Sequence, residues 1–200
     1  NKKYYIIMKL VELILDDEDA IGVEAISVVL NPAIESDFIA LSKHNIELAE
    51  INKEKRLLMG ALLIPNKPIP RNGKGDEIYH IFFSKDTISK ASQMYLQNGN
   101  QSNSTLEHKD QLKGLTLVES WIVENKEKDK TALYGLDVPV GTWMGSVKVE
   151  NEEVWNSYVK TGKVKGFSIE GYFADKIENK PKEELSAKQI TINELKELLK

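Results

Sequence analysis

Short apolar runs rich in β-branched and aromatic residues recur along this chain, and turn-forming residues separate them. Runs of this kind are typical of strands in a sheet, and only a few segments show helical signals. The pattern therefore predicts a strand-rich α+β domain. The predicted strands are 4–15, 38–41, 56–64, 77–83, 115–123, 132–138, 142–149 and 164–173. The segment 21–31 is left without an assignment, although the position of Asn31 before Pro32 favours extended geometry.

Two of the predicted strands, 56–64 and 77–83, are joined by a segment with three prolines and the turn Asn72–Gly75. Neighbouring strands with a turn signal between them commonly pair with each other. We expect these two strands to form one hairpin with a long irregular tip.

Two segments carry clear helix start and stop signals. Ser84 or Asp86 can cap the first helix, and the pair Asn98-Gly99 can end it. Asn151 can cap the second helix, and Gly162 can end it. We therefore expect two helices that flank the strands.

The chain has 200 residues, of which 41% are hydrophobic, and this is enough for one sizeable core. We expect one domain over residues 1–175, in which 45–55 forms a short helix or a loop. The segment 176–200 begins as a linker, because its Lys, Glu, Asn and Pro residues bury little apolar surface. It ends in a predicted amphipathic helix that begins at a capping box of Thr191 and Glu194.

Charge and composition narrow the function classes. The formal net charge of −4 lacks the basic excess of a nucleic-acid-binding protein, so we expect no nucleic-acid partner. The absence of cysteine excludes thiol catalysis and indicates a reducing, cytoplasmic compartment. The apolar segment 4–15 contains Lys9 and Glu12, so we expect neither a signal peptide nor a membrane span. No cofactor or metal motif is recognisable, and we expect neither kind of group.

Three histidines, His44, His80 and His108, are the candidates for a histidine base. His44 lies in a polar segment that is typical of a solvated loop. His80 lies in the strand 77–83, where we expect a strand-edge or tyrosine-bonded histidine. His108 lies where a polar loop gives way to a strand, a position at which scaffolds often present catalytic groups. Its candidate partner is Ser168.

Ser168 lies in the sequence Gly-Phe-Ser-Ile-Glu-Gly within the predicted strand 164–173. A serine hydroxyl is a weak nucleophile until a base takes its proton. Alternation along the strand points Phe167 to the core, and it points Ser168 and Glu170 to the opposite face or a cleft. The two flanking glycines would let a substrate backbone approach closely. A solvent-facing serine without a catalytic role gives the same pattern.

A serine and a histidine need a third group that orients the imidazole. Glu119 is our first candidate, because it interrupts an apolar strand face and a carboxylate there needs a partner. The other members of that predicted face are Leu115, Leu117, Trp121 and Val123. Glu170, two residues from Ser168, and Glu107, beside His108, are the alternatives. A strand-edge glutamate without a catalytic role and a carboxylate-only mechanism are also left open.

Four sequence blocks follow one another in the second half of the chain: Thr105–His108 (TLEH), Gly114–Val123 (GLTLVESWIV), Val138–Met144 (VPVGTWM) and Val164–Phe173 (VKGFSIEGYF). The segments Gly22–Ser27 and Asn31–Glu35 precede them. Together these residues resemble the XkdF-like serine proteases of tailed bacteriophages. The resemblance covers about residues 8–175 and depends on several ordered blocks.

The resemblance implies the fold of the prohead maturation proteases, which is similar to that of herpesvirus assemblin. That fold is a β-barrel with flanking helices, followed here by a C-terminal helical tail. The resemblance implies that Ser168 is the nucleophile and His108 the general base. Assemblin uses a second histidine as the third member and phage enzymes use an acidic residue. No histidine follows Ser168, so Glu119 is our choice for the third member.

The resemblance also implies a biological setting. A prohead maturation protease works in the cytoplasm of the host bacterium, inside the assembling procapsid. It is expected to cleave scaffold and major capsid proteins, and often itself, as a serine endopeptidase. The segment 176–200 fits either the start of a scaffold-like extension or an ordinary tail, and self-association is left open. The alternative function is a non-catalytic scaffold or capsid-assembly factor that keeps the fold and works by binding.

Overall fold

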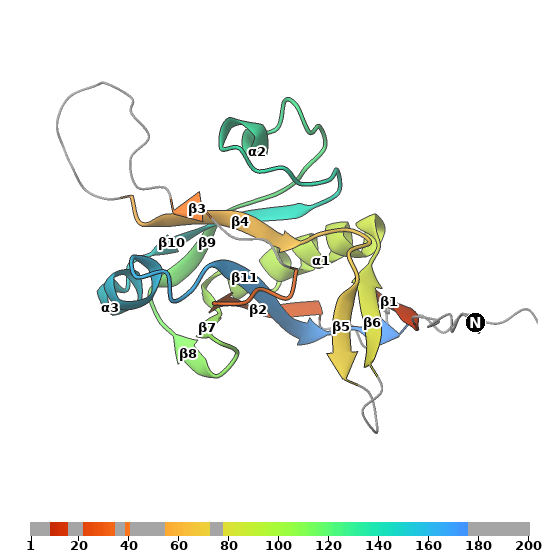
Figure 1. Cartoon of the computed structure of the whole chain (residues 1–200), viewed down its shortest axis with the longest axis horizontal. Coiled ribbons are helices and arrows are strands. Elements are labelled where there is room, and N and C mark those ends of the chain that lie inside the picture. The colour runs from red at the N-terminus through yellow and green to blue at the C-terminus, as the bar shows by residue number, and fades with distance from the viewer. Residues whose placement is uncertain (1–8, 16–21, 35–38, 41–54, 73–77, 176–200) are drawn as a thin grey trace, which may run out of the picture.

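The computed structural model describes residues 9–15, 22–34, 39–40, 55–72 and 78–175 (Figure 1). The strands of these ranges form three four-stranded sheets, and helices are few. This confirms the predicted strand-rich α+β class. No closed barrel joins the strands of the described ranges, so the assemblin-like β-barrel stays a prediction.

Each sheet is assembled from strands that are distant in the sequence. The first has the order β12 (Ala174–Asp175), β1 (Leu10–Ile14), β6 (Ile78–Phe83) and β5 (Ile69–Asn72). The second has the order β11 (Gly166–Tyr172), β2 (Gly22–Val29), β7 (Ser104–Leu106) and β8 (Asp110–Leu112). The third has the order β3 (Ile39–Ala40), β4 (Leu57–Leu63), β10 (Trp143–Val149) and β9 (Leu115–Ile122).

Most strands lie where the apolar runs predict them. The confirmed predictions are those for 38–41, 56–64, 77–83, 115–123, 142–149 and 164–173, and β1 lies within the predicted strand 4–15. The segment 21–31, which we left without an assignment, contains β2. The predicted segment 45–55 lies almost wholly outside the described residues, and 176–200 lies wholly outside them. The helical tail and the domain boundary after residue 175 therefore stay predictions.

The predicted hairpin of 56–64 with 77–83 is wrong, because β4 and β6 lie in different sheets. β4 pairs with β3 and β10, whereas β6 pairs with β1 and with β5. Asn66 has a left-handed backbone, with φ 57°, and its N–H donates to Phe83 O over 2.8 Å. The chain therefore leaves the third sheet at this turn and enters the first sheet as β5. The edge position of β5 tolerates Pro70, which has no N–H to donate.

The predicted strand 132–138 is also wrong. Asp129 caps a short helix, α2 (Lys130–Leu133), by accepting a hydrogen bond from the N–H of Thr131 over 2.9 Å. Leu133 is 80% exposed, whereas Val138 at the end of the run is buried in the core, so the run is not a strand that is buried along its length. The cap decides the local structure here, because it satisfies backbone donors without a partner strand.

Both predicted helices are confirmed. In α1 (Lys85–Gln97), Ser84 Oγ accepts from the N–H of Thr87, and Gly99 follows the helix in a left-handed conformation with φ 73°. A short 3₁₀ turn, η1 (Asn100–Ser102), then leads to β7. The second helix begins as α3 (Glu152–Val154) at the cap Asn151 and continues as the π-helical segment η2 (Trp155–Val159).

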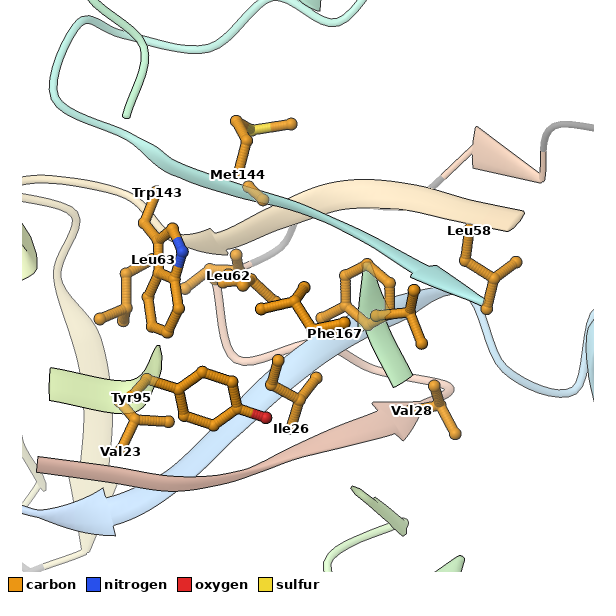
Figure 2. Close-up of a cluster of buried hydrophobic side chains, with 14 of the residues drawn as sticks. Val23, Ile26, Val28, Leu58, Leu62, Leu63, Tyr95, Trp143, Met144 and Phe167 are labelled. Carbon is orange, nitrogen blue, oxygen red and sulfur yellow. The ribbon is translucent and has the colours of Figure 1, made fainter. Parts of the chain in front are cut away.

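The hydrophobic core lies between the second and third sheets and extends to Ile69, Ile81 and Phe83 of the first sheet. The helix α1 packs against β2, β9 and β10 (Figure 1). Figure 2 shows Ile26 and Phe167 of the second sheet facing Leu62 and Trp143 of the third sheet. The ring of Tyr95 from α1 meets the Trp143 ring edge to face, with 5.6 Å between their centroids. Because Phe167 is buried in this core, the next residue of β11 is directed to the opposite face of the second sheet.

Candidate active site

Ser168 belongs to a polar row that crosses three strands of the second sheet. It lies opposite Ser27 in the antiparallel pair β11–β2, and Ser27 lies beside Thr105 in the parallel pair β2–β7. Cross-strand partners share one face of a sheet, so these three side chains lie on the face away from Phe167. Ser168 is only 8% exposed, and Ser27 is fully buried. The serine is therefore not an ordinary solvent-facing residue.

Gly171 serves strand packing and does not provide room for a substrate. A Cβ atom placed there would lie 2.1 Å from Gly22 O and 2.8 Å from Val23 Cα. The register of β11 with β2 also shifts between Glu170 and Gly171. The close approach that we predicted for a substrate backbone at this glycine is used instead by β2, at a bulge.

His108 is presented by a tight turn between β7 and β8. Glu107 and His108 both have left-handed backbones, with φ 51° and 58°. Such a conformation costs about 1–2 kcal/mol for a residue with a side chain. The N–H of His108 donates to Ser27 Oγ over 3.0 Å, and Ser27 Oγ donates to Thr105 O over 3.3 Å. The buried hydroxyl of Ser27 thus holds the unfavourable turn in place.

The side chain of Glu107 anchors the same turn. Its Oε1 atom accepts the N–H of Leu30 over 2.6 Å, and its own N–H donates to Val28 O over 3.2 Å. Both contacts connect the turn to β2 and the residue that follows it. Glu107 was an alternative for the acid that orients His108, but its carboxylate is bonded to the backbone of Leu30.

Glu170 is the carboxylate that meets His108. Its Oε1 atom lies 3.1 Å from His108 Nδ1, and Thr105 Oγ1 donates a hydrogen bond to the same oxygen. The side chains of His108 and Glu170 are 42% and 32% exposed, so the pair lies at the surface. A carboxylate on Nδ1 fixes the imidazole tautomer in which Nε2 can accept a proton. Glu170 is thus placed to orient the imidazole of His108, the role that we predicted for Glu119.

Glu119 lies in the third sheet, on a strand with a bulge. Ser146 of β10 lies opposite Glu119, whereas the next residue, Val147, lies opposite Leu117, so Val118 is left unpaired. An extra residue in one strand reverses the alternation beyond it. The predicted single face of Leu115, Leu117, Glu119, Trp121 and Val123 is therefore wrong. Glu119 and Leu117 lie on opposite faces.

The carboxylate of Glu119 has its own partners. Lys130 Nζ lies 2.5 Å from Glu119 Oε2, and Ser146 Oγ donates to the same oxygen. The hydrogen bond from Lys130, followed by that from Ser146, lowers the pKa of Glu119 against the opposing effect of burial. The structure does not bring Glu119 to His108, because the local bulge and Lys130 of α2 hold it in another sheet. Glu119 as the third residue therefore stays a prediction, and the contact of Glu170 with His108 Nδ1 favours the alternative that we named.

The other two histidines do not reach this site. β6 lies between β1 and β5, so His80 is not at a sheet edge as we expected. The buried Nδ1 of His80 has no hydrogen-bond partner among the described residues, so the expected tyrosine bond is absent there. His44 lies outside the described residues.

Ser168 and His108 line one hollow of about 600 Å³ together with Ala33 and Arg71. In the part of the chain that the structure describes, no hydrogen bond joins Ser168 to His108. Catalytic hydrogen bonds are often loose in a site without substrate and tighten when it binds. A serine and a histidine thus line one accessible space, and the histidine is bonded to the carboxylate of Glu170.

The described residues contain no group of three or more side chains that could hold a metal ion. Within the same ranges no helix is long and apolar enough to cross a membrane.

Ser27 and Thr105 are the two site residues that the sequence did not single out. Ser27 is one hydroxyl within an apolar run, between Ile26 and Val28, and Thr105 lies in a polar segment. A polar residue at a core-like position of a strand is the available signal for Ser27, because such a group needs a hydrogen-bond partner. Its partner is on another strand, and the sequence does not reveal which one.

These observations define a strand-rich α+β protein with a surface hollow lined by a serine and a histidine. The chain belongs to the family described as "Putative phage serine protease XkdF", whose model matches residues 45–178. The match confirms the XkdF-like resemblance and includes His108, Ser168 and Glu170. The segments Gly22–Ser27 and Asn31–Glu35 lie outside it. No curated protein and no solved structure matches the chain.

The role of Ser27 can be tested by Ser27→Ala, which removes the acceptor of the His108 N–H. We expect the free energy of unfolding to fall by about 0.5–1.5 kcal/mol, because the His108 N–H loses its acceptor on β2. The His108 amide should exchange with solvent faster, as measured by NMR.

Ser92→Ala is the matched control, because Ser92 is also buried and its Oγ bonds to Ser89 O within α1. It should leave the exchange of the His108 amide unchanged. An unchanged rate in Ser27→Ala as well would contradict the role of Ser27 in holding the turn.

The bonding of Glu119 predicts a pH-dependent contribution to stability. Its pKa is lower in the folded protein, so the contribution is present above the unfolded pKa and is lost as the pH falls through the folded pKa. Glu119→Gln should therefore lower stability at pH 7 by at most about 1 kcal/mol, because the pair is exposed. Urea denaturation near pH 3 should show a smaller difference between the two proteins. A difference that grows on acidification would contradict this bonding.

Proposed function

We propose that this protein is a serine endopeptidase of capsid maturation in a tailed phage, with Ser168 as nucleophile, His108 as general base and Glu170 as the acid that orients His108. The bond between Glu170 and His108 Nδ1 is the observation that carries the proposal. Glu170 and Ser168 lie two residues apart on β11, and Ser168 and His108 line the same hollow. The family description supports the reaction class.

The first half of the proposed reaction forms an acyl-enzyme. Ser168 Oγ attacks the carbonyl carbon of a peptide bond, and His108 Nε2 takes the hydroxyl proton. The carbonyl oxygen carries the negative charge in the tetrahedral intermediate. When that intermediate collapses, the C–N bond breaks and His108 returns its proton to the leaving amine. An ester between Ser168 and the acyl half of the substrate remains.

The second half releases the acyl group. A water molecule attacks the ester carbonyl while His108 Nε2 takes one of its protons. Collapse of this second intermediate breaks the bond to Ser168 Oγ, which regains its proton from His108. The products are a carboxylic acid and the original enzyme, so the histidine is unchanged after one turnover.

Glu170 acts in this scheme by stabilising the imidazolium that forms in each step. Thr105 Oγ1 holds the carboxylate oxygen that faces His108 Nδ1, and Thr105 lies on the strand that leads into the histidine turn. The acid and the base are therefore both held by β7 and its turn. Thr105 is a positioning residue in this scheme.

The setting that we propose is the assembling procapsid in the host cytoplasm. The substrates would be segments of scaffold and major capsid proteins, and also the chain itself. The resemblance to the prohead maturation proteases motivates this setting, and the family description supports its phage context. A scaffold-like role for the segment 176–200 belongs to the same proposal.

The nucleophile and the base can be tested with a peptidyl diphenyl phosphonate. The probe forms an Oγ–P bond with an activated serine and releases phenol. We expect labelling at Ser168 in the wild-type chain, and we expect Ser168→Ala and His108→Ala to reduce it by about three orders of magnitude or more.

Ser92→Ala should label like the wild type, because it removes a buried hydroxyl at a distance from the site. Mass spectrometry of the labelled peptide locates the modified residue. Labelling that does not depend on His108, or a folded protein that is not labelled, would favour the non-catalytic assembly factor instead.

The acid can be assigned by comparing Glu170→Gln with Glu119→Gln. The first change removes the negative charge beside His108 Nδ1 and should slow labelling by about 100-fold or more. The second change should leave the rate within about two-fold, because Glu119 bonds to Lys130 and Ser146. The two variants carry the same chemical change, so each is the control for the other, and the reverse ranking would restore Glu119 as the acid.

A further inference from the structure

A second hollow adjoins the one that His108 lines, and Ser168 belongs to both. We call it the apolar hollow; it has a volume of about 300 Å³ and lies where β11 passes the first sheet. Ser168, Ile169, Ala33 and Arg71 line both hollows, whereas His108 lines only the larger one. Ser168 therefore stands at the boundary between a space that faces the histidine and a space that does not.

The apolar hollow has a floor of core side chains. Leu62, Ile69, Ile81 and Phe83 contribute to it, and each is at most 5% exposed. Among the described residues that line it, Arg71 is the only charged one. Arg71, two tyrosines and Ser168 add polar groups to the lining, whereas the floor is apolar. An apolar group that packs against this floor is stabilised, because apolar surface is removed from water.

The size of the apolar hollow fits one side chain. A cavity of about 150 Å³ lined by Leu, Ile and Phe is enough to bind benzene, so about 300 Å³ accommodates a leucine, methionine or phenylalanine side chain. An amphipathic helix would need a longer groove, because it buries anchors over several turns. The dimensions thus favour a single apolar side chain as the occupant.

We propose that the apolar hollow binds an apolar side chain of the peptide substrate, next to the bond that is cleaved. This inference rests on the proposed function. A carbonyl carbon in position for attack lies about 3–3.5 Å from the nucleophile, so the adjoining side chain is within reach of any hollow that Ser168 lines. The substrate class is accordingly a peptide with a leucine-, methionine- or phenylalanine-sized residue at the cleavage site.

Leu13 is the position at which this subsite can be altered separately. It lines the apolar hollow but not the hollow of His108, and it is half-buried. Leu13→Trp should fill the hollow, and Leu13→Ala should enlarge it. Leu10 lies on the same strand, is 51% exposed and lines neither hollow, so Leu10→Trp is the matched control.

The experiment uses phosphonates that differ only in the side chain next to phosphorus: leucine, phenylalanine, alanine, lysine or aspartate. The leucine and phenylalanine probes should label Ser168 at least about 10-fold faster than the other three. Leu13→Trp should abolish that preference, Leu13→Ala should shift it toward phenylalanine, and Leu10→Trp should preserve it. Equal rates for all five probes would overturn the subsite and leave the protease standing.

A binding measurement tests the apolar hollow independently of the proposed reaction at Ser168. N-acetyl-leucinamide, titrated into Ser168→Ala, should shift the NMR signals of the Ile169 and Phe173 amides, and Leu13→Trp should remove the effect. N-acetyl-aspartamide is the control ligand. If no phosphonate labels Ser168 but N-acetyl-leucinamide binds in this way, the protease is refuted and the apolar site is supported. If neither occurs, both are refuted.

Discussion

The candidate site depends on the pairing of β2 with β11 on one side and β7 on the other. This one strand sets Ser168 opposite Ser27 and Ser27 beside Thr105, although these residues are far apart in the sequence. The core-facing side chains Val28 and Phe167 hold the pairing in register, because a slip of one residue would move them to the other face. The hydrophobic packing below the sheet therefore determines the polar arrangement above it.

The turn of Glu107 and His108 between β7 and β8 keeps the polar side chains in place at an energetic cost. Two consecutive left-handed residues with side chains are unfavourable, and hydrogen bonds with Ser27 of β2 and with Leu30, which follows β2, offset part of that cost. The same turn aims His108 at Glu170, whose carboxylate is also held by Thr105. Glu119 shows the contrasting case, because its negative charge is already paired with Lys130. Glu170 and Glu119 have the same side chain, but their different neighbours leave only Glu170 bonded to His108.

Local patterns predicted the elements well where local interactions decide them. Ser84 and Gly99 delimit α1 because capping involves only residues within one or two turns of the helix end. The wrong hairpin and the wrong strand at 132–138 arise where a more distant or competing interaction decides. Asn66 directs β5 into another sheet, and Asp129 caps a helix within an apolar run. The bulge at Val118 left no recognisable signal, although it changes the face on which Glu119 lies.

The sequence by itself determined the strand-rich class, most element positions, the family and the choice of Ser168 and His108 as candidates. These features depend on residue type, periodicity and ordered motifs, all of which are local or linear properties. Only the tertiary structure decided that Glu170 meets His108, that Ser27 holds the turn and that an apolar hollow adjoins Ser168. Those facts depend on strand register and on which sheets meet, and contacts between distant residues leave no periodic signal in one sequence.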